Sequence, residues 1–290
     1  MSDKVVRIVT ERVIEGLKKG KVAWQKPWNS VESRPRNMVS GKHYRGVNAL
    51  SLCEPVSDRP DPNWLTMKQI KQLGLCLAKG EKYTPVAFWK WTERVKNGRT
   101  ENIPFVRFYQ VYNRQQLEGA AEMWPLDKVG SKPEMAEEEW EKNASLILKN
   151  YQERGGSRIE FGGSSAFYRP STDTIGMPVR GDFITQAQYW STLFHEVVHS
   201  TGAESRLNRD LKGFRSDNHA YSKEELVAEM GSCFVMADLG VDVHFDNSIA
   251  YLQAWLEKLE DDPKLLMQAA QRAEKAYDFI KGVSWDDRKA

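Results

Sequence analysis

Cysteine is scarce in this chain: its 290 residues contain only Cys53, Cys76 and Cys233, and no two of them form a CxxC pair. An odd number without paired spacing argues against a disulfide framework and indicates a reducing compartment. No apolar run approaches the roughly 20 residues that a membrane span requires. The opening segment mixes acids and bases in an amphipathic pattern, so it predicts a first helix rather than a signal peptide. We therefore expect a cytoplasmic protein without a membrane partner.

The chain as a whole has little net charge, only +2 at pH 7. The balance nevertheless changes along the chain. Residues 1–117 hold 22 Lys and Arg against 10 Asp and Glu, and the other 173 residues hold 20 against 30. A step of this size favours two units with different partners. The alternative is an uneven distribution that folding spreads over one surface.

Internal repeats and low-complexity tracts are absent, and one break divides the chain. Pro125, Gly130 and Pro133 interrupt regular structure there, and an acidic helix start follows them. Before the break, a helical pattern at 64–80 precedes strand-like runs at 84–91 and 104–113. After the break, helical patterns dominate and short strand-like runs separate the first two. The sequence predicts an α+β protein with a mixed N-terminal domain at 1–125, a linker at 126–136 and a second domain at 137–290.

The segment from Phe194 to Gly202, FHEVVHSTG, contains an HExxH motif. The preceding residues have a helical apolar pattern, and positions i and i+4 of a helix lie on one face. His195 and His199 are therefore placed to hold one metal ion, with Glu196 beside them as a general base for metal-bound water. The motif is short, so its context has to support it. The run at 173–180, DTIGMPVR, is expected to be an edge strand that aligns an extended substrate beside the motif helix.

The third ligand is expected from the carboxylate-rich helix at 222–240. The metzincin pattern HExxHxxGxxH holds as far as Gly202 and fails at Ser205, because a hydroxyl group is a poor zinc ligand. Glu225 and Glu229 lie one helical turn apart, and the residues that follow Glu225 resemble those of gluzincins. This favours Glu225 as the ligand and Glu229 as support for a histidine N–H, and the reverse assignment stays open.

Two imidazoles and one carboxylate leave a fourth metal position open for water, as in a gluzincin-like zinc peptidase. Zinc is the expected ion, and the same ligands would accept manganese or cobalt. His219 and Tyr221 are candidates for stabilising a transition state, although packing roles are the stronger interpretation. Two alternatives stay open. The carboxylates could simply pair with the histidines, or the site could bind metal and cleave nothing.

The basic half contains five of the ten tryptophans, interleaved with lysine and arginine in segments such as AWQKPW and FWKW. Cations that follow phosphates and aromatic rings that stack on bases are typical of proteins that hold single-stranded nucleic acid. A recognition helix for duplex DNA is not found. About half of the aromatic residues are expected to serve packing. The candidate DNA-binding residues are Trp24, Lys26, Trp28, Arg36, Tyr44, Arg45, Lys68, Lys71, Lys82 and Trp89.

A series of longer segments carries a specific resemblance. GKVAWQKPWN, SGKHYRGVNALSL, WLTMKQIKQLGLCLAKGEKYTPVAFWKW and FYQVYNRQQLEG resemble, in this order, the N-terminal domain of the ArdC antirestriction family over nearly all of residues 5–120. HEVVHSTGAESRLNRD and the EELVAE helix are similar to the zincin-like domain of the same family. The resemblance thus covers almost the whole chain.

The resemblance implies a single-stranded DNA-binding domain joined to a metallopeptidase-like domain. It further implies that the protein protects incoming plasmid DNA from host restriction during conjugation, with host restriction-system proteins as partners. The acidic balance after residue 117 confines the DNA-binding expectation to the first half. A stand-alone cytosolic zinc protease, and a DNA-binding protein with a purely structural metal site, are the alternatives.

Overall fold

The computed structural model describes residues 2–25, 27–28, 33–96, 99–125, 135–211, 223–243 and 249–283. Residues 2–6, 8–9, 89–96, 99–106 and 249–250 are described by their backbone alone. Helices and two small sheets alternate along the described part of the chain, which confirms the predicted α+β class. Among these residues, no helix combines the length and the apolar character that crossing a membrane requires.

The N-terminal half builds a four-stranded sheet with helices around it. Its elements are α1 (Ser2–Lys18), β1 (Arg36–Asn37), α2 (Val47–Leu52), α3 (Glu54–Ser57), β2 (Asn63–Thr66), α4 (Met67–Gln72), β3 (Thr84–Lys96), β4 (Arg99–Asn113) and α5 (Ala120–Met123). The strand order is β1-β2-β4-β3, with β1 parallel to β2 and the other neighbours antiparallel. Strands β3 and β4 form one hairpin that pairs Thr84 with Val111 at one end and Lys96 with Arg99 at the other. The two strand-like runs of the sequence are confirmed.

The helix predicted at 64–80 is wrong in its extent. Trp64 and Leu65 belong to β2, and α4 begins only after Thr66. The Thr66 hydroxyl accepts a hydrogen bond from the Gln69 backbone N–H, and the Gln69 side chain accepts one from the Thr66 backbone N–H. This capping box marks the start of the helix, because it satisfies two of the backbone N–H groups that have no partner at a helix N-terminus.

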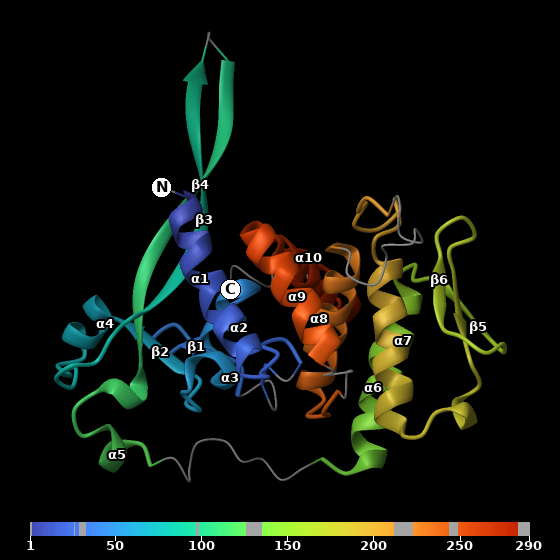
Figure 1. Ribbon diagram of the computed structural model, residues 1–290, viewed down its shortest axis with the longest axis horizontal. Helices are drawn as coiled ribbons and strands as arrows, with labels where there is room; N and C mark the ends of the chain where they lie inside the picture. Colours follow the sequence, from blue (N-terminus) through green and yellow to red (C-terminus); the bar gives the residue numbers. More distant parts are fainter. Residues whose placement is uncertain are drawn as a thin grey trace.

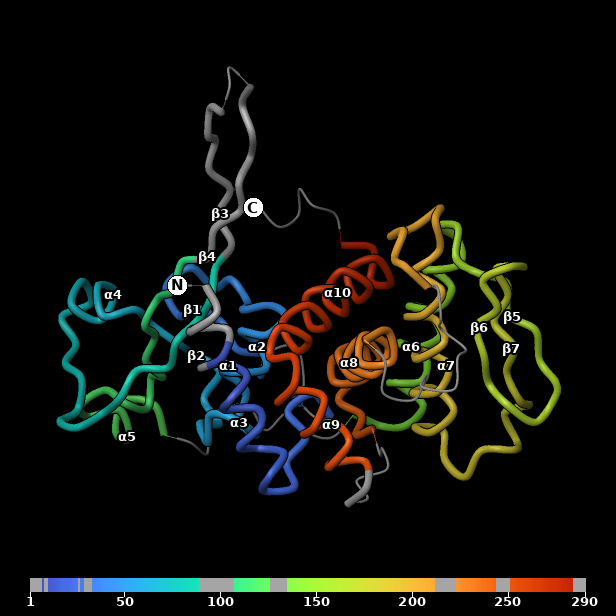
Figure 2. The backbone as a smooth tube through the Cα atoms, turned by 45° about the horizontal axis from the view of Figure 1, so that its top comes forward, coloured from blue at the N-terminus to red at the C-terminus, as the bar shows by residue number. Residues whose placement is uncertain are grey.

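The C-terminal half combines long helices with a three-stranded sheet. Its elements are α6 (Glu137–Glu153), β5 (Arg158–Phe161), β6 (Phe167–Arg169), β7 (Thr174–Met177), α7 (Gln186–Ser200), α8 (Lys223–Asp238), α9 (Ile249–Asp261) and α10 (Pro263–Lys281). The sheet lies beside α7 at one end of the molecule (Figures 1 and 2). Short 3₁₀ turns at Arg114–Gln116 and Arg180–Asp182 complete the two halves. Helix α6 begins after the predicted break, and its first turn carries three glutamates that favour the positive end of the helix dipole.

The strand that precedes the motif helix is not an edge strand. The order of the small sheet is β5-β7-β6, so β7 is central and pairs with a neighbour on each side. Its four residues, Thr174–Met177, are all buried. A strand with both edges occupied cannot add a substrate strand, because its N–H and C=O groups are already paired. The expected substrate-aligning role of the run at 173–180 is therefore wrong.

The two halves of the chain share one hydrophobic core. Figures 1 and 2 show helices α8, α9 and α10 lying between the N-terminal half and the unit formed by α6, α7 and the small sheet. Helix α1 packs against α9 and α10, and α7 packs against α8. A single cluster of buried apolar residues includes Leu17 and Trp24 from the first half and Phe194, Phe234 and Leu266 from the second. The domain limits at 1–125 and 137–290 stay a prediction.

A buried ion pair joins the halves across this core. Arg34 Nη2 lies 2.6 Å from Glu274 Oε1 of α10, and the two side chains are only 7% and 6% exposed. The guanidinium group also lies over the rings of Trp28 and Tyr277. The Gly46 backbone N–H donates to the other oxygen of Glu274 at 3.0 Å. A positive charge of the N-terminal half thus neutralises a buried carboxylate of α10, that of Glu274.

We expect Arg34→Met to destabilise the protein, because it leaves the buried carboxylate of Glu274 without its main partner. Loss of one member of a buried pair typically lowers the free energy of unfolding by about 3–5 kcal/mol. Urea denaturation followed by circular dichroism measures the change. The matched control is Arg158→Met, which breaks an exposed pair with Glu160 and should cost about 1 kcal/mol or less. Equal losses in the two variants would contradict a structural role for the buried pair.

Candidate functional site

Helix α7 presents the motif histidines on one face. The Thr185 hydroxyl caps the helix by accepting from the Gln188 backbone N–H at 3.1 Å. Its apolar residues face the core, and nine of its side chains are buried. Because His195 and His199 are four residues apart, their rings lie on consecutive turns with centroids 4.7 Å from one another. The structure therefore brings the two histidines together as the sequence predicts.

A glycine lets helix α8 approach α7 closely. A Cβ atom at Gly231 would lie 2.8 Å from a Cγ atom of Val198, which comes between the two motif histidines in the sequence of α7. Any larger residue would force the helices apart, since such a contact is shorter than real Cβ atoms make. The close approach carries the first turn of α8, with Glu225, up to the histidine rings.

His195, His199 and Glu225 form a group whose ligand atoms all lie within 4.8 Å of one another. The two Nε2 atoms are 3.1 Å apart, and the Glu225 oxygens lie 3.3 Å from His195 Nε2 and 3.4 Å from His199 Nε2. Two metal–ligand bonds of about 2.0–2.1 Å at a tetrahedral angle place their donor atoms about 3.3–3.4 Å apart. The two carboxylate distances, one to each Glu225 oxygen, match that separation, and the distance between the imidazole nitrogens is slightly shorter. The chemistry and the spacing of these side chains therefore fit a zinc-like ion. Glu229 lies outside the group.

His199 is held by Glu224, which is not the residue that the sequence favours for this role. The Glu224 carboxylate lies 3.4 Å from His199 Nδ1 and pairs with Arg209, whose Nη2 is 2.6 Å from it. Burial would lower the pKa of His199, but hydrogen bonds with Glu224 and Glu225 raise it to about 9. Burial would likewise raise the pKa of Glu225, and its hydrogen bonds with both histidines hold that pKa below its usual value.

The Glu229 carboxylate makes its hydrogen bonds to residues other than the histidines, which corrects its predicted role as support for a histidine. Its Oε2 atom accepts hydrogen bonds from Trp24 Nε1 at 3.2 Å and from the Tyr251 hydroxyl at 2.7 Å. Burial raises the pKa of Glu229, and the bonds from Tyr251 and Trp24 oppose that rise. Adjacent residues of a helix lie about 100° apart, so only one of Glu224 and Glu225 can face the metal. The adjacent pair Glu224 and Glu225 was therefore the feature of the sequence that could have identified one ligand and one supporting carboxylate.

The environment of the group leaves one side accessible. The His195 side chain is 21% exposed, whereas that of His199 is 2% exposed. Glu196 lies on α7 between the two histidines and is buried. The predicted helpers His219 and Tyr221 lie outside the described residues. A fourth ligand would therefore approach from the His195 side.

Several residues that the sequence assigns to DNA binding belong to the core. Trp24, Trp28 and Tyr44 are 0%, 4% and 6% exposed, and the Trp28 N–H donates to Asp238 at 3.1 Å. Their rings have no free face for a base, which corrects the assignment. Arg45 pairs with Asp278 and is 3.2 Å from Glu274.

The other predicted DNA-binding residues have different positions. Arg36 donates to Asn63 at 3.0 Å and is half-buried. Lys26, and the side chain of Trp89, lie outside what the structure describes. Lys68, Lys71 and Lys82 are exposed. Three of the ten predicted residues thus remain on the described surface as unburied cations.

Lys68 and Lys82 line a groove of about 910 Å³ on the N-terminal sheet. Tyr83 and Tyr109 stand in it with 48% and 37% of their surface exposed. The Nη1 atom of Arg12 is buried there and has no hydrogen-bond partner among the described residues. Arg12, Tyr83 and Tyr109 were not among the DNA-binding residues predicted from the sequence, because that prediction relied on tryptophans next to basic residues. The full lining is Arg12, Thr66, Met67, Lys68, Glu81, Lys82, Tyr83, Pro85, Phe108, Tyr109, Gln110 and Tyr112.

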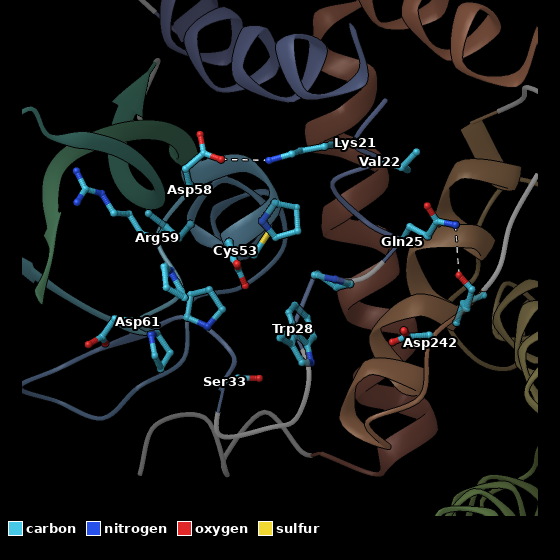
Figure 3. Close-up of a pocket in the computed structure, with 18 of the residues that line it drawn as sticks. Lys21, Val22, Gln25, Trp28, Ser33, Cys53, Asp58, Arg59, Asp61 and Asp242 are labelled. Carbon is cyan, nitrogen blue, oxygen red and sulfur yellow. Dashed lines mark hydrogen bonds and ion pairs between the residues drawn. The ribbon is translucent and has the colours of Figure 1, made fainter. Parts of the chain in front are cut away.

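A second cavity, of about 740 Å³, lies where the two halves meet (Figure 3). Its lining comes from residues 20–62 and 242–243, away from the metal ligands in sequence. Lys21 is paired with Asp58 at 3.2 Å, and Gln25 Nε2 donates to the Val243 carbonyl at 3.3 Å. The Gln25 bond joins the N-terminal half to residue 243 of the C-terminal half, so this cavity borders the contact between the halves.

We expect Glu224→Gln to weaken metal binding about 10–100-fold, the usual effect of removing a carboxylate that orients a metal-bound histidine. The amide keeps the size of the side chain and loses the charge that faces His199 and Arg209. Calorimetric titration of the metal-stripped protein with zinc measures the affinity. The matched control is Glu138→Gln on the exposed side of α6. An affinity within two-fold of the unaltered protein would contradict the role of Glu224.

Comparison with known proteins covers both halves. A family model described as the N-terminal domain of anti-restriction factor ArdC matches residues 3–112, and one described as a zincin-like metallopeptidase matches residues 148–272. Two proteins named DNA primase TraC, from Escherichia coli, are 36% and 34% identical over 94% of this chain. The chain spans only 19% and 26% of the length of those two relatives.

Two further comparisons extend over nearly the whole of both chains. An uncharacterized protein, y4eC of Sinorhizobium fredii (strain NBRC 101917 / NGR234), is 33% identical over 97% of this chain and 92% of its own. The crystal structure of the antirestriction protein ArdC from the R388 plasmid is 34% identical. Its metal-free form matches with a TM-score of 0.72 over 95% of this chain and 96% of its own, and its Mn(II)-bound form matches with 0.73 over 96% and 97%. This chain therefore belongs to the ArdC antirestriction family, with an ArdC-type N-terminal domain followed by a zincin-like metallopeptidase domain.

Proposed function

We propose that this chain is a plasmid antirestriction protein that binds single-stranded DNA with its N-terminal half and holds a divalent metal ion in its zincin-like half. It would act in the cytoplasm, on DNA that enters during conjugation, with host restriction-system proteins as partners. The observation that carries the proposal is the meeting, in one chain, of a cationic aromatic groove and a two-histidine, one-carboxylate group.

The groove supports binding of a single strand rather than a duplex. Exposed tyrosine rings offer faces on which unpaired bases stack, and Lys68 and Lys82 offer charges for phosphates. A buried guanidinium N–H without a partner, as at Arg12, costs free energy until an acceptor reaches it. A phosphate oxygen supplies such an acceptor. The acid of the groove, Glu81, is already engaged by Arg59 at 2.9 Å.

The metal group supports a gluzincin-like centre. His195, His199 and Glu225 would hold the ion, which when bound supplies a Lewis acid and lowers the pKa of water. Zinc is the expected ion, and the same ligands accept manganese or cobalt. Glu196 lies between the two histidines in the sequence of α7, and we propose its carboxylate as the group that accepts a proton from water. A site that binds metal for structural purposes alone is the second candidate, because β7 offers no free edge to a peptide.

We expect Lys68→Ala combined with Lys82→Ala to weaken binding of a labelled single-stranded oligonucleotide in a salt-dependent way. Each phosphate contact contributes about 0.7 to the slope of log affinity against log salt for single strands, so the slope should fall by about 1.4. Fluorescence anisotropy of the full chain over a salt series measures it. Lys142→Ala combined with Lys149→Ala, on exposed positions of α6, is the control. An unchanged slope would mean that the DNA does not contact Lys68 and Lys82 and binds outside this groove.

We expect Glu196→Gln to keep the metal and to abolish any peptide cleavage, because the amide cannot accept the proton of water. Metal content is measured by mass spectrometry of the purified protein, and cleavage is measured by incubation with restriction-system proteins. Protection of plasmid DNA in cells is scored in parallel. If the variant still protects DNA, proteolysis is not the mechanism and the structural metal site becomes the favoured function.

A further inference from the structure

A cluster of four side chains links the N-terminal half to the helix that carries Glu225. Trp24 follows α1, Glu229 lies on α8, and Tyr251 and Trp255 lie on α9. Both hydrogen bonds to Glu229, from the Trp24 indole and the Tyr251 hydroxyl, reach the same oxygen. The Trp255 ring packs edge-on against both other rings, with centroids 6.1 Å from Trp24 and 6.4 Å from Tyr251. Trp24 and Trp255 are fully buried.

This cluster lies one helical turn beyond the metal ligand. Glu225 is the third residue of α8 and thus belongs to its first turn. The first four N–H groups of a helix have no partner within the helix, so the helix constrains its first turn less than its middle. Tertiary contacts therefore have to fix the position of the first turn of α8. Glu229 lies four residues after Glu225 on the same face of the helix, and its hydrogen bond from Trp24 connects this part of α8 to the N-terminal half.

We propose that Trp24 and Tyr251 are positioning residues of the metal centre. By holding the Glu229 carboxylate they fix the turn of α8 that aims Glu225 at His195 and His199. The N-terminal half therefore contributes to the affinity of the metal, although none of its described residues belongs to the ligand group. The proposal rests on the metal centre proposed above.

The physical basis is the burial of Glu229. A carboxylate in an apolar core requires hydrogen bonds, and loss of one donor makes it rotate toward another partner or take up a proton. Either change alters the contacts of Glu229 and so the position of the neighbouring turn of α8, which carries Glu225. Because the donor set of a metal tolerates errors of only a few tenths of an ångström, a small movement of Glu225 costs affinity.

The chain contains a matched contact for comparison. Trp28 also follows α1, is also buried, and also donates its indole N–H to a carboxylate of α8, that of Asp238, at 3.1 Å. Asp238 ends the helix, 13 residues after Glu225, which is about 20 Å along the axis. Replacing either tryptophan by phenylalanine removes the same N–H and a similar volume. Only Trp24 acts next to the metal ligand.

The test is cobalt(II) titration of the full-length, metal-stripped protein, followed by the visible absorption bands of the bound ion. Zinc affinity is measured in parallel by competition with a chromophoric chelator. The variants are Trp24→Phe, Tyr251→Phe and the control Trp28→Phe, each checked for folding by near-ultraviolet circular dichroism. We expect Trp24→Phe and Tyr251→Phe to raise Kd about 10-fold or more and to shift the cobalt(II) bands, as removal of supporting residues does. Trp28→Phe should leave Kd within two-fold.

Two results would overturn the proposal. One is an unchanged Kd and spectrum in both Trp24→Phe and Tyr251→Phe. The other is an equal loss in Trp28→Phe, which would mean that any loosening of α8 has the same effect. Failure of the unaltered protein to bind cobalt(II) or zinc at all is a different outcome, because it would remove the metal centre itself. If only Trp24→Phe fails to fold, Tyr251→Phe decides.

Discussion

Helix α8 is buried along nearly its whole length, and the four carboxylates that it carries inward each need a partner. Every residue from Glu224 to Ala237 is buried, and the Asp238 side chain is 1% exposed. An unpaired buried charge costs several kcal/mol. The partners come from all around the helix: His199 and Arg209 for Glu224, the histidines for Glu225, Trp24 and Tyr251 for Glu229, and Trp28, Tyr277 and Lys281 for Asp238. Each of the four carboxylates thus has a partner from another part of the described structure.

Local patterns predicted the parts of this arrangement that lie close in sequence. The HExxH spacing placed His195 and His199 on one helical face, and the one-turn spacing on α8 narrowed the third ligand to two glutamates. The two strands of the β3–β4 hairpin and the helix at Glu137–Glu153 also followed from periodicity. These features depend on residues a few positions apart, so a single sequence contains them. The fold class followed because such elements alternate along the chain.

The errors concern contacts between residues far apart in sequence. Trp24 and Trp28 lie more than 200 positions before their carboxylate partners, and nothing in the AWQKPW segment distinguishes an indole that stacks on a base from one that bonds to a buried acid. The charge step was misleading for the same reason. Arg34, which is buried, and Arg45, which is partly exposed, pair with the buried Glu274 and Asp278. Part of the positive charge of the first half therefore serves docking of the two halves. Only the cations left over are available to DNA.

The shared core also constrains how the two proposed activities combine. Helix α1 contributes Arg12 to the groove, packs against α9 and α10, and leads to Trp24 beside the metal-binding helix. Groove and metal centre thus belong to one framework rather than to units joined by a flexible tether. A tether would raise the effective concentration of the centre near any protein on the DNA, over a range set by its length. A rigid connection instead fixes the offset between the strand and the metal, so only a protein segment at that offset could reach it.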